Sequence, residues 1–202
     1  MNKGEKSMKI KKNITINFNA PVILGFSFIC LIALLLGMIT RGNSTKILFI
    51  TYRDSLLNPM TYLHFFSHVF GHQNWAHFIG NMSYILLLGP MLEEKHGGMK
   101  MVEIILITAL VTSLVNFIFF PRVSLCGASG VVFAFILLTS FTSFKEGEIP
   151  LTFILVALIF LGQQVFEGVS IRNNVSNLSH IIGGIVGAVF GYFLNVNKKG
   201  RY

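Results

Sequence analysis

The sequence predicts an all-α polytopic membrane protein whose six transmembrane helices pack as a bundle. Hydrophobic residues make up 53% of the 202 residues and charged residues only 12%, about half the charged fraction of a typical soluble domain. Several apolar runs approach the roughly 20 residues that a helix needs to cross a bilayer. The net charge of +8 gathers beside these runs, which indicates contact with lipid headgroups and not with nucleic acid.

The apolar runs define six spans, at residues 20–40, 75–92, 101–120, 127–144, 150–166 and 178–196. The first run is too long for the apolar part of a signal peptide, and no small-x-small cleavage site follows it, so we expect a retained helix. Residues 20–196 then form one membrane domain between two basic tails, 1–19 and 197–202. The two cysteines, Cys30 and Cys126, indicate neither a disulfide framework nor a metal site.

Lysine and arginine predict the orientation of the spans, because these residues concentrate on the cytoplasmic side of a membrane. With the N-terminus inside, eleven of the sixteen basic residues are cytoplasmic: Lys3, Lys6, Lys9, Lys11, Lys12, Lys95, Lys100, Lys145, Lys198, Lys199 and Arg201. The other side holds five: Arg41, Lys46, Arg53, Arg122 and Arg172. We therefore expect both termini in the cytoplasm.

Two outer segments follow from this topology. The first outer loop, about 41–74, is too long and too aromatic for a simple connector, as "MTYLHFFSHVF" shows. Long loops of this kind carry structure of their own or a function. The last outer loop, 167–177, is polar and contains no apolar run.

Polar residues recur at the start of spans two, four and six, which all run from the outside inward. His77 and Asn81 share one face of span two, Ser129 opens span four and His180 lies near the start of span six. Polar groups at such depths usually face a wet cavity inside the bundle. Gly183 and later glycines repeat every four residues and would let span six approach span four closely, which would bring His180 to Ser129.

These residue types fit acyl transfer. A serine becomes a nucleophile when a neutral histidine takes its proton, and no acidic residue lies near His180, so the sequence predicts a Ser129–His180 dyad. Phe133, one turn below the serine, can stack on the imidazole. His77, Asn81 and the free N–H groups of a helix N-terminus are donors for a developing oxyanion.

Structural alternatives remain open for these residues. Ser129 could bond back to a carbonyl of its own helix, as serines in membrane helices often do. His64, His68 and His72 recur every four residues, but no H-E-x-x-H motif or interleaved acidic residue accompanies them. We therefore expect no metal site and interpret these histidines as interfacial or structural.

The chain resembles the rhomboid family of intramembrane serine proteases in three motifs: "GASG" (127–130), "HFIGN" (77–81) and "SHIIGG" (179–184). The motifs occur in the family's order over roughly residues 60–195, which implies a six-transmembrane-helix rhomboid-like bundle. The resemblance implies that Ser129 is the nucleophile, His180 the general base, and His77 and Asn81 the oxyanion-stabilising pair.

Further roles are implied by the same resemblance. His68 and His72 would line the cavity or be structural. Apart from the resemblance, Gly127 and Gly130 would leave room for a substrate backbone, because they carry no side chain. Glu93 and Gly97 would lie after the second span as loop scaffolding. Two positions depart from the family pattern: Leu63–His64 replaces the usual Trp-Arg, and Phe133 replaces a common tyrosine.

The function expected from these observations is that of an intramembrane serine endopeptidase. It would cleave single-span membrane-protein substrates near the outer face of the bilayer, with no cofactor, in a plasma membrane, expected to be bacterial. One alternative is a catalytically inactive relative that binds membrane-protein clients. A small transporter is another, although neither an inverted repeat nor an acidic residue central to a span is visible.

Overall fold

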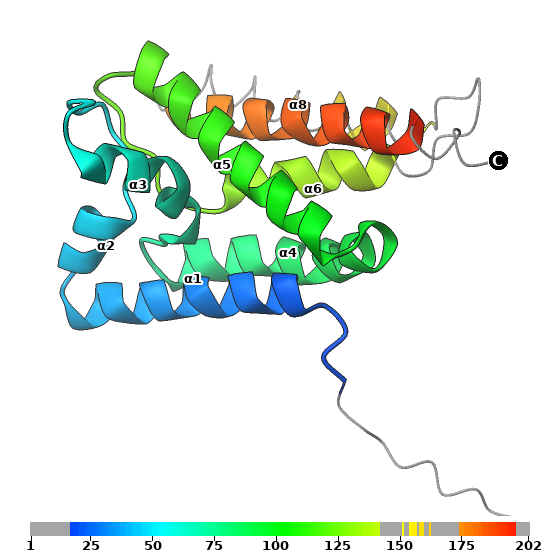
Figure 1. Ribbon diagram of the computed structural model, residues 1–202, viewed down its shortest axis with the longest axis horizontal. Coiled ribbons are helices and arrows are strands. Elements are labelled where there is room, and N and C mark those ends of the chain that lie inside the picture. Colours follow the sequence, from blue (N-terminus) through cyan, green and yellow to red (C-terminus); the bar gives the residue numbers. More distant parts are fainter. Residues whose placement is uncertain are drawn as a thin grey trace, which may run out of the picture.

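The computed structural model describes residues 17–141, 151, 154–156, 158–159, 162 and 174–196. Most of these residues are helical, as the sequence predicts (Figure 1). In chain order the elements are α1 (Pro21–Ile39), α2 (Asn43–Leu48), α3 (Pro59–Ser67), the 3₁₀ turn η1 (His68–Phe70), α4 (Trp75–His96), α5 (Gly98–Phe119), α6 (Ser129–Phe141) and α8 (Asn174–Val196).

Five of the six predicted spans correspond to α1, α4, α5, α6 and α8. Within the described residues, α1 and α5 are long and apolar enough to cross a membrane, and α6 and α8 contain shorter apolar stretches, Ser129–Ser140 and Ser179–Leu194. The predicted fifth span, 150–166, and residues 167–173 of the last outer loop lie mostly or wholly outside the described residues. The six crossings therefore remain a prediction.

Three helix ends differ from the predicted boundaries. α4 continues through Pro90 to His96 and ends at Gly97, whose φ of 85° leaves the helical region. α6 begins at Ser129 and not at 127, because Gly127 has a φ of 131°, which a right-handed helix excludes. α8 begins at Asn174, inside the segment predicted as the last outer loop.

The helices alternate in direction. Figure 1 shows α4, α6 and α8 running one way and α1 and α5 the other way. The first residues of α4, α6 and α8 therefore lie at one end of the bundle, where the sequence places its polar residues.

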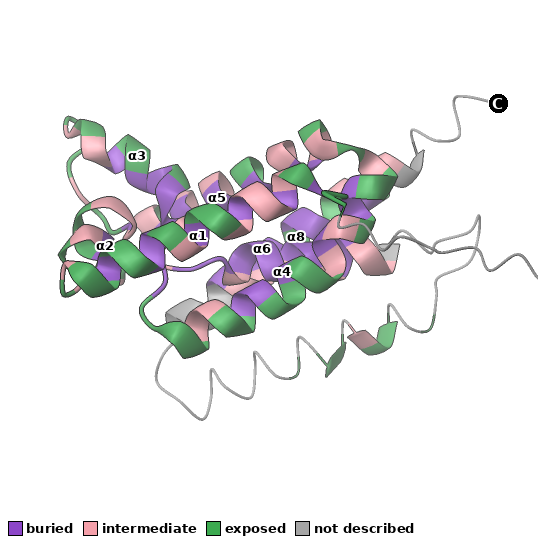
Figure 2. Cartoon of the chain, turned by 90° about the horizontal axis from the view of Figure 1, so that it is seen from below, coloured by how far each residue is buried: buried purple, intermediate pink, exposed green. Residues whose placement is uncertain are grey.

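α6 is the central helix of the bundle. It packs against α4, α5 and α8, and its Val131, Phe135 and Leu138 are fully buried. Figure 2 shows the buried residues concentrated along α6 and the helices beside it. Because α6 is enclosed by three neighbours, its first residue, Ser129, lies where those helices come together.

Two glycines bring α8 into backbone contact with α6, as the repeat in the sequence predicts. A Cβ atom at Gly183 would lie 2.1 Å from the Gly130 carbonyl oxygen, and one at Gly187 would lie 2.1 Å from the Ala134 carbonyl oxygen. Neither distance leaves room for any side chain. The absence of a side chain at these two positions therefore sets the spacing between the helices that carry Ser129 and His180.

Glu93 lies inside α4 and not in a loop after it, which corrects the expectation for this residue. Its buried carboxylate accepts hydrogen bonds from the backbone N–H groups of Val22 (3.0 Å) and Ile23 (2.9 Å). These are among the N–H groups that a helix leaves unpaired at its start. Glu93 thus caps α1 from the far end of α4.

Segment 41–74, predicted as the first outer loop, carries structure of its own in the form of α2, α3 and η1. It is tied together by side chains that bond to backbone carbonyls. The Ser67 hydroxyl donates to the Leu48 carbonyl, and the Ser113 hydroxyl of α5 donates to the Phe65 carbonyl at 3.0 Å. The loop is therefore fixed to the bundle through α5.

Replacing Glu93 tests the cap. Glu93→Ala would leave two buried N–H groups unsatisfied, and we expect it to lower the free energy of unfolding in detergent by about 3 kcal/mol. Glu93→Gln keeps one acceptor oxygen and should cost less. The exposed neighbour Glu94 is the control, because Glu94→Ala should change stability by less than about 0.5 kcal/mol. Equal losses at the two positions would contradict the cap.

Replacing Gly187 tests the helix contact. The Cβ of Gly187→Ala would meet a backbone oxygen that cannot swing away, so α8 must shift, at an expected cost of about 1–3 kcal/mol or more. Gly25→Ala in α1 is the matched control, because nothing lies within 4 Å of a Cβ at Gly25. Unfolding in mild detergent should separate the two variants, and equal stability would refute the close contact.

Candidate active site

One cavity of about 970 Å³ collects the polar residues that the sequence singles out. It lies among α4, α5, α6, α8 and the segment 120–128 that precedes α6. Seven of the predicted site residues line it: His77, Asn81, Gly127, Ser129, Gly130, Phe133 and His180. These residues come from three helices and one turn, so only the folded bundle assembles them.

Ser129 is the first residue of α6 and is partly exposed to the cavity. Some serines within the described helices bond back to a carbonyl four residues earlier, as Ser83 does to Ile79 and Ser140 to Ile136. The carbonyl four residues before Ser129 belongs to Leu125 and lies outside the helix. The position of Ser129 thus differs from that of a serine bonded within its own helix.

The turn before the serine is held by backbone hydrogen bonds to the first outer loop. Leu125 forms an antiparallel bridge with Thr51 through bonds of 3.0 and 2.8 Å, and the Gly127 N–H donates to the His68 carbonyl at 2.9 Å. At Gly127 a Cβ would lie 2.6 Å from the His77 ring. Glycine is therefore required here both for its positive φ and for this close approach.

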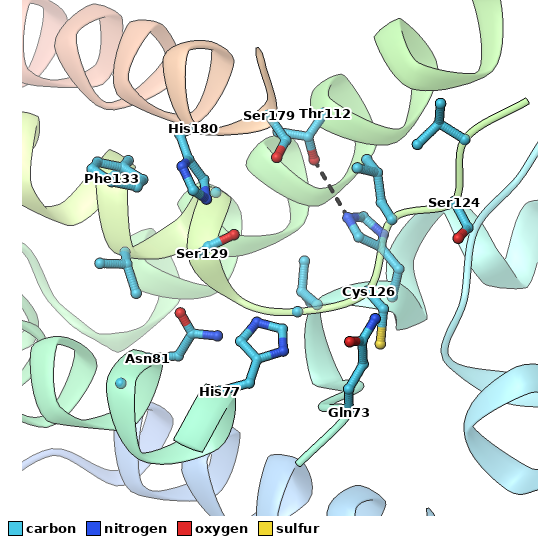
Figure 3. Close-up of a pocket in the computed structure, with 18 of the residues that line it drawn as sticks. Gln73, His77, Asn81, Thr112, Ser124, Cys126, Ser129, Phe133, Ser179 and His180 are labelled. Atoms are coloured by element: carbon cyan, nitrogen blue, oxygen red, sulfur yellow. Dashed lines mark hydrogen bonds between the residues drawn. The ribbon is translucent and has the colours of Figure 1, made fainter. Parts of the chain in front are cut away.

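His180 projects from α8 toward Ser129 (Figure 3). Its ring stacks on Phe133 of α6, with centroids 4.5 Å apart and planes at 40°, which is the contact that the sequence predicts. The stack restrains the imidazole from one side. Gly130 also lines the cavity, and it contacts Gly183 of α8. Its expected role, to leave room for a substrate backbone, stays a prediction.

His77 and Asn81 lie on the opposite side of Ser129 from His180, one turn apart on α4 (Figure 3). The helix begins at Trp75, because the Asn74 side chain accepts a hydrogen bond from the His77 N–H at 2.9 Å, as an N-cap does. Asn81 is buried, and its Nδ2 lies 3.1 Å from Nε2 of His72. The arrangement presents ring and amide nitrogens beside the serine.

The three regularly spaced histidines bond to carbonyls. His64 Nε2 lies 2.8 Å from the Ile47 oxygen, His68 Nδ1 lies 3.2 Å from the His64 oxygen, and His72 Nδ1 lies 3.1 Å from the Phe70 oxygen. Among the described residues, no three His, Cys, Asp or Glu side chains converge as a metal site would require. The interpretation as structural histidines accounts for each of these contacts.

Sequence reasoning missed several residues that line the cavity: Gln73, Tyr84, Thr112, Ser124 and Cys126. Most are single polar residues in loops or helices, without a spacing that would mark them. Cys126 is close to the proposed nucleophile in sequence, but burial raises the pKa of its thiol to about 12. The thiol therefore stays protonated at neutral pH and does not compete as a nucleophile.

The match to a known family covers residues 59–197, more than half of the chain, and the matching family model is the Rhomboid domain. The chain belongs to the rhomboid family. The family includes proteases, such as Rhomboid protease GlpG of Haemophilus influenzae.

Individual rhomboid relatives are distant. Rhomboid-related protein 2 of Mus musculus is 31% identical over 158 residues, which cover 68% of this chain and 52% of the relative. Rhomboid-related protein 1 of Caenorhabditis elegans is 31% identical over 142 residues, 66% of this chain and 40% of the relative. The chain thus spans about half the length of these two relatives or less. Rhomboid protease GlpG of Haemophilus influenzae is 27% identical over 144 residues, 67% of this chain and 71% of the relative.

The two departures from the rhomboid pattern are accommodated locally. His64 is buried and links α3 to the end of α2 through the Ile47 carbonyl, while Tyr52 packs near its ring at 5.9 Å. Leu63 is exposed. His64 therefore holds the first outer loop in the absence of the Trp-Arg pair, and Phe133 keeps the stack on His180 without a hydroxyl.

Two buried histidines predict a loss of stability in acid. Burial lowers the pKa of His68 and of His72 to about 4, from about 6.5 in the unfolded chain. The folded protein keeps both rings neutral, so their contribution is complete above pH 6.5 and is lost as the pH falls toward 4. The thermal midpoint in detergent should fall between pH 6.5 and 4. The amide of His68→Asn can still donate to the His64 carbonyl but does not titrate, so the thermal midpoint of this variant should fall less than that of the wild type over the same pH range. The same pH dependence in the variant and the wild type would contradict the assignment.

Proposed function

We propose that this rhomboid protein is an intramembrane serine endopeptidase with Ser129 as nucleophile and His180 as general base. One observation carries the proposal. Ser129, His180, His77 and Asn81, which come from three different helices, line a single cavity, with the imidazole stacked on Phe133. Membership of a protease family supports the same reading.

The first half of the reaction forms an acyl-enzyme. His180 takes the proton of the Ser129 hydroxyl as the oxygen attacks the scissile carbonyl. The negative charge that develops on the carbonyl oxygen is stabilised by backbone N–H groups at the start of α6 and by the side chains of His77 and Asn81. When the tetrahedral intermediate collapses, His180 gives its proton to the leaving amine.

The second half releases the other fragment. A water molecule gives a proton to His180 and attacks the ester carbonyl on Ser129, and the same donors stabilise the second oxyanion. Collapse of this intermediate returns the proton to the serine oxygen. The net reaction is the hydrolysis of one peptide bond, and no cofactor takes part.

The proposed substrates are single-span membrane proteins that unwind near the outer face. A helical segment hides its carbonyls in its own hydrogen bonds, so the scissile bond must be extended to reach Ser129. The distribution of basic residues supports an arrangement with both termini in the cytoplasm, which places the start of α6 near the outer face. A bacterial plasma membrane is part of the proposal; the relatives above come from animals as well as a bacterium.

Covalent labelling with a fluorophosphonate tests the proposal on the purified protein in detergent. The wild type should label, Ser129→Ala should not label at all, and His180→Ala should label at least about 10³-fold more slowly. Ser83→Ala, which changes a serine bonded within α4, should label like the wild type. Cleavage of a single-span substrate in vesicles should follow the same order.

Two results would overturn this assignment. Labelling that survives Ser129→Ala would place the nucleophile elsewhere. A wild type that never labels or cleaves, yet retains membrane-protein clients on co-purification, would identify an inactive relative that binds them.

A further inference from the structure

His72 lies directly behind the candidate site and has no part in the reaction proposed above. It sits in the short segment between η1 and α4, and only 2% of its surface is exposed. It does not line the cavity, but it touches both residues proposed to stabilise the oxyanion. Its ring packs edge-on against His77 at 5.1 Å, and its Nε2 lies 3.1 Å from Nδ2 of Asn81.

The hydrogen bonds of His72 determine which ring nitrogen carries the proton. The Phe70 carbonyl, 3.1 Å from Nδ1, can only accept, so Nδ1 must donate. In a neutral ring the other nitrogen, Nε2, is then an acceptor. The partner of Nε2 is therefore an N–H of the Asn81 amide. Burial supports the neutral form, since it lowers the pKa of His72 to about 4.

This bond decides which way the Asn81 amide faces. The amide has a nitrogen on one branch and an oxygen on the other, and only the nitrogen can stabilise a negative charge. One N–H of this nitrogen donates to His72, and the second N–H of the same nitrogen stays available for another acceptor. That nitrogen lies 3.6 Å from the position of a Cβ at Gly127, beside the turn that leads into Ser129. In the reversed orientation, the amide oxygen would occupy this place and repel an oxyanion.

The ring of His72 is itself restrained. It packs edge-on against Phe78 at 5.4 Å as well as against His77. Asn81 is 7% exposed, so most of its side chain is enclosed by the protein and only a small part faces the cavity. Both members of the pair are therefore held in one arrangement by packing.

We propose that His72 is a positioning residue that, as a neutral acceptor, fixes the Asn81 amide with its nitrogen toward the oxyanion formed at Ser129. The proposal rests on the function proposed above. His72 touches no reacting atom, and it acts only through Asn81. Its loss should therefore lower kcat and leave KM nearly unchanged, because the oxyanion exists only in the transition state and the intermediates.

Two variants separate positioning from a general structural role. The amide of His72→Asn can replace Nδ1 and keep the bond to the Phe70 carbonyl, but it is too short to reach Asn81. The longer side chain of His72→Gln can place its oxygen where Nε2 was and accept from Asn81. A merely structural histidine would make the two variants similarly active. Positioning through Asn81 predicts that His72→Asn is at least tenfold slower in kcat than His72→Gln.

A double-mutant cycle completes the test. Asn81→Ala should lower kcat by about 10²-fold, and adding His72→Asn to it should cause little further loss, since there is no amide left to orient. The full-length protein is assayed in vesicles with a single-span substrate, and the thermal midpoint of every variant is measured alongside. Fluorophosphonate labelling of Ser129 gives a second rate for each variant.

The outcomes distinguish this inference from the function on which it rests. A wild type that neither labels nor cleaves would refute the proposed protease, independently of His72. With an active wild type, equal activity of His72→Asn and His72→Gln would overturn the positioning role. The positioning role would also be overturned if the fold-losses in kcat caused by His72→Asn and by Asn81→Ala multiplied in the double variant.

Discussion

The close contact between α6 and α8 is the constraint on which the candidate site depends. Gly183 and Gly187 allow α8 to rest on the backbone of α6 at Gly130, which directly follows Ser129, and at Ala134. Side chains cannot fill this contact, so the depth and the rotation of α8 are fixed within narrow limits. The same contact brings the His180 ring to Phe133. In a bilayer the hydrophobic effect contributes little to the association of helices. Close packing of the backbones of α6 and α8 therefore stabilises the bundle instead.

A second constraint is the need to satisfy polar groups in an apolar molecule. Buried side chains meet it in pairs: Glu93 with the start of α1, Ser113 with the Phe65 carbonyl, and His72 with Asn81. The first two pairs join helices that are far apart in sequence, and the third fixes the segment before α4 to α4 itself. Because an unpaired buried group is costly, these bonds also fix the geometry around the cavity. The same contacts thus satisfy the buried polar groups and hold the residues around the cavity in place.

Much of this arrangement follows from sequence, and the reasons for the failures are specific. The type of fold, the helices at Ser129 and His180, and the glycine contact follow from apolar length and four-residue spacing. The end of α4 does not, because Pro90 is accommodated inside the helix and Gly97 ends it. Neither the partners of Glu93 nor the acceptor for Asn81 could be predicted, since individual side-chain hydrogen bonds, whether across 70 residues or across nine, leave no periodic pattern in the sequence. The contact between Gly130 and Gly183 could not be predicted either, because the spacing of glycines in α8 does not say which residues of α6 they meet.

The capping of α1 by Glu93 has a consequence for the order in which the protein matures. The N–H groups of Val22 and Ile23 belong to α1, but their acceptor is synthesised about seventy residues later. Until α4 has been made, α1 must satisfy those groups with other partners, such as water at the bilayer surface. Insertion of α1 and its final docking are therefore separate events, and the start of α1 is completed only after α4 has been synthesised.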